Sequence, residues 1–203
     1  MTVCTKTYAA PPLINRREIL RYAGVRGEAP ELEALLEECI AESDGKLSYK
    51  VCWREFPVKH REDILDLGFA ETSSASLIRN LAGCGSVVLF AATVGIGMDR
   101  AIARYSSLSP AKALLLQALG TERIEALCDM FNEEVTREQA AMGRETRPRF
   151  SPGYGDLPLD MQKSIFAVLD CPRKIGLSLN ENLLMSPSKS VTALIGVTAD
   201  GVL

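Results

Sequence analysis

The amino-acid sequence predicts an α+β fold in which helices pack with a mixed or antiparallel twisted sheet. Strand-like and helix-like segments mix along the chain without regular β-α alternation, which argues against a doubly wound parallel sheet. Residues 86–93 are almost continuously apolar and predict a central strand buried on both faces. Residues 109–142 carry an apolar stripe at helical spacing, which predicts a long helix with a possible bend at Gly120.

Two helices and a strand are expected before residue 60. Asn15 is a suitable N-cap for the first helix, because its side chain can accept a hydrogen bond from an unpaired backbone N–H. Pro30 suits the first position of the second helix. Residues 47–58 alternate between apolar and polar and predict a strand with one covered face, and the charged residues 59–63 predict a solvated turn.

A helix is expected from about Thr72, ahead of the central strand, and another from 98 to 105 behind it. The strand, the glycine turn at 95–97 and the following helix resemble a phosphate-binding unit. The third glycine of G-x-G-x-x-G is absent, however, and Asp99 stands where an anion would need a donor. We therefore interpret the segment as a tight structural turn, with nucleotide binding as the alternative.

The C-terminal third predicts one helix and two strands. Pro158 is expected to begin a helix that runs through Leu169 and ends at Cys171-Pro172. Residues 176–185 and 190–198 are expected to be strands. We expect residues 1–83 to form a helical and strand segment that packs on a core of residues 84–203, the two parts making one continuous domain.

The composition indicates an ordinary globular protein. The chain has 203 residues, of which 47% are hydrophobic and 24% charged, and its formal net charge is −3. This balance gives no electrostatic footprint for nucleic acid or an anionic membrane. The first residues do not have the pattern of a signal peptide, and no apolar run is long enough to span a bilayer, so we expect a cytoplasmic protein.

The cysteines and the single histidine do not predict a metal site. Six cysteines are scattered without a C-x-x-C pair, which indicates reduced and mostly buried thiols. His60 is the only histidine, so a zinc site or a histidine-activated nucleophile has few possible members. A hydrolase or thiol enzyme that pairs Cys128 or Cys171 with His60 stays open as one alternative.

The segment 147–158 is the strongest candidate for a functional loop. It reads Arg-Pro-Arg-Phe-Ser-Pro-Gly-Tyr-Gly-Asp-Leu-Pro, and its three prolines and two glycines exclude a helix interior or a central strand. Pro152-Gly153 suits the central positions of a type II turn. We expect that turn to direct the backbone N–H groups of Gly153 and Tyr154 outward, although an ordinary surface connection would have the same composition.

Three separated segments resemble the activation (reactivation) domain of cobalamin-dependent methionine synthase. The string Arg149-Phe-Ser-Pro-Gly-Tyr154 is similar to that family's Arg-Pro-x-Pro-Gly-Tyr signature. The helix segment 125–135 and the segment Met185-Ser-Pro-Ser-Lys-Ser-Val191 are similar to family segments before and after the signature. The resemblance covers roughly residues 84–198, in the same order as in the family. The homocysteine, folate and cobalamin modules of the full-length enzyme have no counterpart here, so we expect a free-standing form.

The resemblance implies a reactivation subunit rather than an independent catalyst. In the family, the domain binds S-adenosylmethionine (SAM) and caps the cobalamin (vitamin B12) module, and SAM methylates cobalt that an electron donor has reduced from inactive cob(II)alamin. The implied partners are a cobalamin-dependent methionine synthase or another corrinoid protein, together with a flavodoxin-like or ferredoxin-like donor. The implied setting is methionine biosynthesis.

The resemblance also assigns roles to particular residues. Arg149 is expected to hold the carboxylate of SAM through its planar fork. Glu125 is expected to balance the cationic end of the ligand. Ser151, Pro152 and Gly153 are expected to contact the ligand along the turn. Ser151 matches a family position that contacts the ligand through its backbone, and the Pro152-Gly153 turn is expected to offer exposed N–H groups. Tyr154 is expected to face the corrin and to be the catalytic residue.

Several departures from the family pattern leave a second function open. Phe150 replaces a proline of the signature, and Gly155 replaces the proline that usually follows the tyrosine, which predicts a more mobile loop. An N-terminal acidic SAM contact has no matching position, and the given sequence ends before a tyrosine-bearing segment that closes the family's site. We therefore expect SAM affinity to be low or to be completed by the partner. The alternative is an interaction module for a corrinoid protein that keeps the fold without SAM chemistry.

Overall fold

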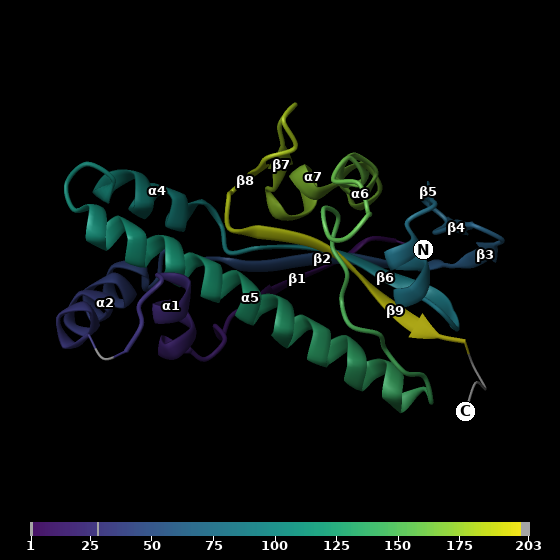
Figure 1. Cartoon of the computed structure of the whole chain (residues 1–203), viewed down its shortest axis with the longest axis horizontal. Coiled ribbons are helices and arrows are strands. Elements are labelled where there is room, and N and C mark those ends of the chain that lie inside the picture. The colour runs from purple at the N-terminus through teal and green to yellow at the C-terminus, as the bar shows by residue number, and fades with distance from the viewer. Residues whose placement is uncertain (1, 28, 200–203) are drawn as a thin grey trace.

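A four-stranded antiparallel sheet forms the middle layer of the molecule. The computed structural model describes residues 2–27 and 29–199, and its sheet has the strand order β1-β2-β6-β9. The strands are β1 (Cys4–Tyr8), β2 (Tyr49–Pro57), β6 (Cys84–Thr93) and β9 (Ser190–Thr198). The sheet therefore draws strands from both halves of the chain and leaves β9 at one edge (Figure 1).

Four helices cover one face of this sheet. The long helix α5 (Pro110–Ala141) runs along the sheet (Figure 1), and it packs with α1 (Arg16–Tyr22), α2 (Pro30–Ser43) and α4 (Ile96–Tyr105). Shorter elements cover the opposite face: α3 (Ala75–Asn80), α6 (Met161–Leu169), α7 (Cys171–Ile175) and a small sheet of β3 (Lys59–Arg61), β4 (Ile64–Asp66) and β5 (Glu71–Thr72). A two-stranded hairpin of β7 (Ser178–Leu179) and β8 (Met185–Ser186) lies beside α6 and α7.

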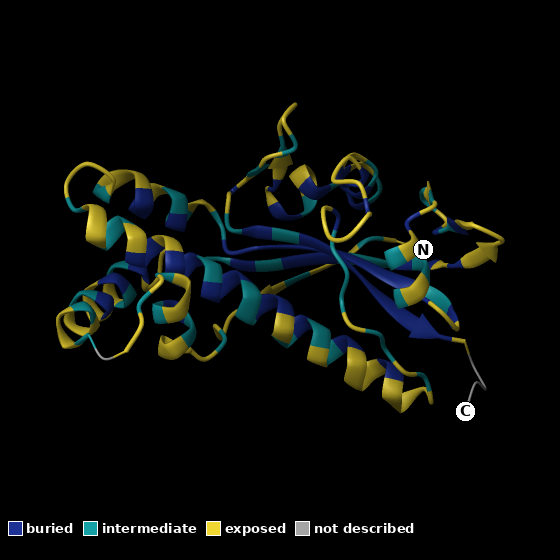
Figure 2. Cartoon of the chain, viewed as in Figure 1, coloured by how far each residue is buried: buried dark blue, intermediate teal, exposed yellow. Residues whose placement is uncertain are grey.

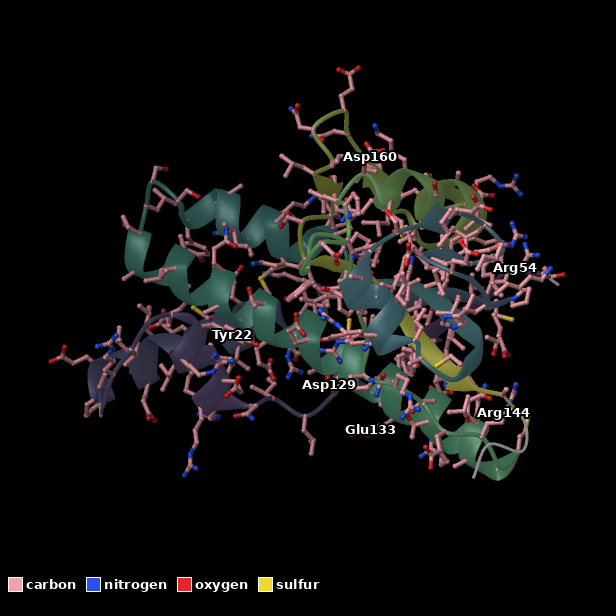
Figure 3. The ribbon with its side chains drawn as sticks, turned by 45° about the vertical axis from the view of Figure 1, so that its right-hand side comes forward. Tyr22, Arg54, Asp129, Glu133, Arg144 and Asp160 are labelled. Atoms are coloured by element: carbon pink, nitrogen blue, oxygen red, sulfur yellow. The ribbon has the colours of Figure 1, made fainter. Side chains whose placement is uncertain are left out.

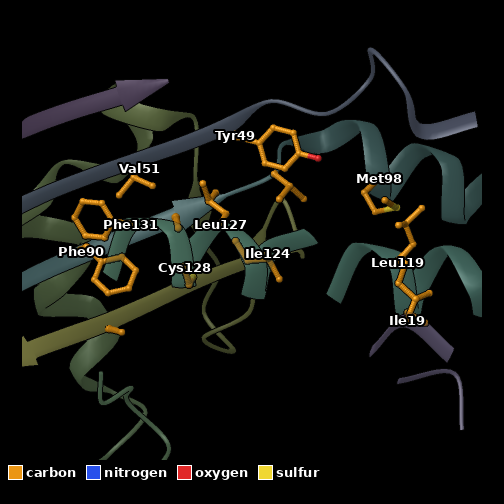
Figure 4. Packing of buried hydrophobic residues seen from close by; sticks show 14 of the residues in the cluster. Ile19, Tyr49, Val51, Phe90, Met98, Leu119, Ile124, Leu127, Cys128 and Phe131 are labelled. Atoms are coloured by element: carbon orange, nitrogen blue, oxygen red, sulfur yellow. The ribbon is translucent and has the colours of Figure 1, made fainter. Parts of the chain in front are cut away.

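Each face of the central strand contributes to its own hydrophobic core. In β6, Val88, Phe90 and Ala92 join the core under α5, while Val87, Leu89 and Ala91 join the core under α6 and α7. This alternation follows from the period of two in an extended strand. Dark blue therefore runs through the sheet in Figure 2, and Figure 4 shows Phe90 and Val51 packed with side chains of α5. The two-faced burial confirms the predicted α+β fold and its central strand.

Most of the predicted helices are confirmed together with their termini. The Asn15 side chain accepts a hydrogen bond from the Glu18 N–H and caps α1, and Pro30 begins α2. The helix expected from about Thr72 begins instead at Ala75, where the Ser74 side chain caps it. Helix α5 is continuous through Gly120, so the expected bend is absent, and the missing side chain at that position makes room for Met98 of α4.

Three expectations about local structure were wrong. The charged segment 59–63 is not only a turn, since its first three residues form β3. The helix expected from Pro158 begins at Met161. It ends at Leu169 as expected, and Cys171-Pro172 then begins the separate helix α7. The stretch 176–185 is a hairpin rather than one strand. The hairpin forms because the Asn180 side chain accepts hydrogen bonds from two backbone N–H groups and closes a turn.

A buried ion pair fixes the N-terminal segment to α5. Arg123 and Glu122 are 2% and 4% exposed, and the Arg123 Nε lies 2.5 Å from a Glu122 carboxylate oxygen. Arg123 also donates to the Pro12 and Leu13 carbonyls, while Glu122 accepts from the Asn15 N–H. The charges are therefore satisfied by hydrogen bonds at the start of α1, which is the condition for burying an ion pair.

The glycine turn before α4 has a packing role. Gly95 has a φ of +81°, and a side chain at Gly97 would place its Cβ 2.0 Å from the Lys46 carbonyl oxygen. Asp99 accepts hydrogen bonds from the Ser188 N–H. The turn is therefore occupied by protein atoms, which supports the structural interpretation over phosphate binding. Among the described residues, no helix is both long and apolar enough to cross a membrane.

Candidate functional site

The loop 147–158 crosses the edge of the sheet. In Figure 1 it rises from the end of α5, passes β9 and reaches α6 on the opposite face. Its first half pairs with β9: Arg147 donates to the Gly196 carbonyl at 2.8 Å, and Phe150 exchanges backbone hydrogen bonds with Leu194 at 2.9 and 2.8 Å. The loop therefore covers the C-terminal part of the edge strand and leaves its N-terminal part open.

The predicted turn at Pro152-Gly153 is present, but its N–H groups are not free. Gly153 has a φ of +91°, and the Tyr154 N–H donates to the Ser151 carbonyl at 3.2 Å, as in a type II turn. The Gly153 N–H donates to the Leu157 carbonyl at 2.9 Å. Both donors that we expected to face a ligand are thus used inside the loop. The Tyr154 bond is the one that closes the turn itself. The Gly153 bond forms because the chain turns back again within four residues and brings the Leu157 carbonyl to that N–H.

Asp156 fastens the second half of the loop to α3. Its carboxylate accepts hydrogen bonds from the Ser74 hydroxyl at 2.5 Å and from the Ala75 and Ser76 N–H groups at 2.8 and 3.1 Å. These hydrogen bonds hold the pKa of Asp156 well below its ordinary value, with the Ser74 bond contributing most. Gly155 packs against the Ser76 side chain and has a positive φ, so the glycine is required there by geometry.

Arg149 reaches from the loop to α5, where it meets two carboxylates. One guanidinium nitrogen lies 2.7 Å from a Glu125 oxygen, and the other pairs with Asp129. Burial by itself would lower the pKa of Arg149, but the hydrogen bond to Asp129 and the charges around it raise the pKa above its ordinary value. Arg149 is therefore a fixed cation between two anions. Asp129 was not among the residues selected from the sequence.

A cavity of about 310 Å³ lies between the loop, α5, α6 and the open end of β9. Five of the six predicted binding residues line it: Glu125, Arg149, Ser151, Pro152 and Tyr154. Gly153 shapes the turn and is not part of the lining. The remaining lining residues, which sequence reasoning did not select, are Phe150, Gln162, Met185, Ser190, Val191 and Thr192. Of these, Met185, Ser190 and Val191 lie in a segment whose family resemblance was the available signal.

The rim of the cavity is exposed and partly apolar. Tyr154, which lines the cavity, is 69% exposed. Glu125 also borders a second hollow of about 460 Å³, which is lined by further acidic side chains on α5 and α1. Figure 3 shows Asp129 and Glu133 of this hollow on α5, with Tyr22 of α1 nearby.

The thiols are poorly placed for nucleophilic chemistry. Cys128 and Cys171 are fully buried, in the cores on opposite faces of the sheet. Burial raises the pKa of Cys128 above its ordinary range, and a hydrogen bond with Cys52 together with burial does the same for Cys171. His60 lies in the exposed strand β3. Within residues 2–27 and 29–199, no group of three or more metal-ligating side chains comes together.

The fold is that of an α+β protein with a cavity at the open edge of its sheet. A family model described as "Vitamin B12 dependent methionine synthase, activation domain" matches residues 77–200. The chain therefore belongs to the activation domain family of vitamin B12-dependent methionine synthases, as its sequence motifs predicted.

One solved structure has the same fold over the whole chain. It is described as the crystal structure of the MetH reactivation domain bound to AdoHcy, and it aligns with a TM-score of 0.66. The alignment covers 100% of this chain and 81% of that chain, at 16% sequence identity. No curated protein sequence matches the chain.

Proposed function

We propose that the protein binds SAM in the cavity beside the loop 147–158 and supports the reductive methylation of cob(II)alamin on a partner protein. The observation that carries this proposal is that Arg149 and Glu125, which are 24 positions apart in the sequence, meet at one cavity next to Tyr154. Family membership and the AdoHcy in the similar solved structure support a ligand of this chemical class. AdoHcy is the product that remains when SAM gives up its methyl group.

The charges at the cavity match those of SAM. Arg149, Glu125 and Asp129 together carry one net negative charge, and SAM, with a carboxylate, an ammonium and a sulfonium, carries one net positive charge. The guanidinium of an arginine has five N–H donors in a fixed fork. Arg149 uses one donor toward Glu125 and one toward Asp129, so other donors remain for the ligand carboxylate. The two acidic side chains can then lie close to the cationic groups.

The chain acts in this proposal as an accessory subunit, and Tyr154 is the residue proposed to touch the reacting groups. Tyr154 lines the cavity and is 69% exposed, so a partner can cover it. The partner is a cobalamin-dependent methionine synthase or another corrinoid protein in the cytoplasm, and a flavodoxin-like or ferredoxin-like protein supplies the electron. The chemistry supplied by the bound groups is transfer of the SAM methyl group to the reduced cobalt, which leaves AdoHcy.

A reconstitution experiment tests this function. The protein is mixed with a cob(II)alamin-loaded methionine synthase core that lacks its own activation domain, a reductant and SAM. The visible spectrum is expected to show methylcobalamin at a rate that depends on both the protein and SAM. The proposal fails if the rate is the same when the protein is left out.

An interaction module without SAM chemistry is the second candidate. It is favoured by the internal hydrogen bonds of the Gly153 and Tyr154 N–H groups and by the existing partners of Arg149, which leave fewer free donors than we expected. Isothermal titration calorimetry with SAM separates the two functions. Heat of binding supports the SAM site, whereas an unresponsive protein that still associates with a corrinoid protein supports the module.

A further inference from the structure

Two buried oxygen atoms in the cavity lack hydrogen-bond partners. Gln162 of α6 is 5% exposed and Thr192 of β9 is 2% exposed. The Gln162 Oε1 and the Thr192 Oγ1 are both buried without a partner within the described part of the chain. Buried polar groups in proteins are nearly always hydrogen-bonded, so each such atom calls for a ligand or another explanation. Here the two residues that carry these atoms come from different elements and line the same cavity.

These atoms lie on the other side of the sheet edge from the ion pair. Arg149 pairs with α5, which covers one face of the sheet. Thr192 is two residues from Leu194, whose side chain is in the core under α6 and α7, so both point toward that face. The cavity therefore has a charged end on the α5 side and an uncharged polar end on the α6 side. Phe150, Met185 and Val191 add apolar surface to the same cavity.

We propose that Gln162 and Thr192 form a base-recognition subsite that binds the adenine ring of the ligand, an inference that rests on SAM binding in this cavity. A ligand with a charged amino-acid group and a neutral, hydrogen-bonding base matches the charged end and the uncharged polar end of the cavity. The exocyclic amino group of adenine donates to the Gln162 Oε1, and glutamine can at the same time donate to a ring nitrogen of adenine. The Thr192 hydroxyl, which can donate or accept, meets a second ring nitrogen.

The same arrangement explains why the polar atoms are tolerated without partners. A buried acceptor without a partner destabilises the free protein, and a ligand that supplies the missing hydrogen bond removes that cost on binding. Replacement of the group by an apolar one of similar shape is then neutral or stabilising for the fold while it weakens the ligand. A residue with a purely structural role would behave in the opposite way.

The chain offers a matched control for this test. Gln139 is also 5% exposed and its Oε1 also lacks a partner, but it lies near the end of α5 and lines a different hollow. The variants are therefore Gln162→Met, Thr192→Val and Gln139→Met. Each is titrated with S-adenosylhomocysteine and S-inosylhomocysteine, in which a carbonyl oxygen replaces the amino group of adenine, and its thermal unfolding is recorded.

The wild-type protein is expected to prefer the adenosyl ligand. Gln162→Met and Thr192→Val are each expected to weaken adenosyl binding by about tenfold. Gln162→Met is also expected to reduce the preference for the adenosyl over the inosyl ligand, and its melting temperature is expected to be equal to or higher than that of the wild type. Gln139→Met is expected to change the affinity for neither ligand.

Three outcomes overturn the subsite. Unchanged affinity in both cavity variants excludes contacts of the ligand with Gln162 and Thr192, while the proposed binding of SAM in the cavity still stands. Equal losses for the two ligands, together with a lower melting temperature, mark a structural role. A wild-type protein that binds neither SAM nor S-adenosylhomocysteine overturns the proposed function and the subsite together.

Discussion

The Arg149 guanidinium donates to the Glu125 carboxylate at 2.7 Å, and this contact joins the loop to the long helix α5. The pair is only partly exposed, with side-chain exposures of 26% and 40%. It has two consequences: the orientation of Arg149 is set before a ligand arrives, and Glu125 is held at the same cavity. Such preorganisation reduces the entropic cost of binding.

Substitution of Arg149 tests the ligand site directly. Arg149→Ala is expected to weaken SAM binding by about 3 kcal/mol, or about a hundredfold in Kd, because the ligand carboxylate loses a bidentate charged partner and two acidic groups are left uncompensated. Isothermal titration calorimetry measures the effect. Arg147→Ala is the matched control, since Arg147 lies two residues away and its guanidinium points to the Ala82 carbonyl. Equal affinities of the two variants would remove Arg149 from the site.

Tyr154 separates binding of SAM from reactivation. Tyr154 lines the cavity and is 69% exposed, so a partner can reach it in the proposed function. Tyr154→Phe is expected to keep the SAM affinity and to slow methylcobalamin formation by about tenfold or more. The stopped-flow visible spectrum of the reconstituted mixture gives the rate. If the variant reactivates as fast as the wild type, the phenol has no part in the reaction.

Asp156 makes the loop anchor dependent on pH. The folded protein holds the pKa of this carboxylate below the ordinary value of 3.8, mainly through the Ser74 hydroxyl. A lowered pKa means that the stabilisation is fully present above pH 3.8 and is lost as the pH falls below that value. Asp156→Asn is therefore expected to lower the melting temperature at pH 7 and to differ less from wild type as the pH falls below 3.8. A difference that stays constant with pH would contradict the anchor.

The sequence predicted the parts of this fold that depend on local patterns. Asn15 and Pro30 carry their helix-start signals within a few residues, and the central strand has apolar side chains on both of its faces. Strand β1 has no such pattern, because an edge strand of five partly exposed residues needs little apolar side chain. Strand β3 is charged and pairs with β4 through its backbone, which leaves no sequence signal.

The candidate site was predictable only in part, for a similar reason. Arg149 and Tyr154 could be found because their motif is short and contiguous, and Glu125 because the resemblance extended to its helix. The internal use of the Gly153 N–H group depends on how the loop folds back, as does the contact between Arg149 and Asp129. The unpaired atoms of Gln162 and Thr192 are a property of tertiary burial, which neither residue type signals by itself.

Gly97 tests the structural interpretation of the glycine turn before α4. A Cβ at this position would lie 2.0 Å from the Lys46 carbonyl oxygen, and backbone cannot yield as a flexible side chain does. Gly97→Ala is expected to cost about 3 kcal/mol of unfolding free energy, measured by urea denaturation. Gly143→Ala is the control: its Cβ would meet nothing within 4 Å, so only the positive φ of 74° is strained, at about 1 kcal/mol. Equal stabilities of the two variants would show that the close approach of Lys46 is not a constraint, and it would reopen the turn as a place where a ligand can bind.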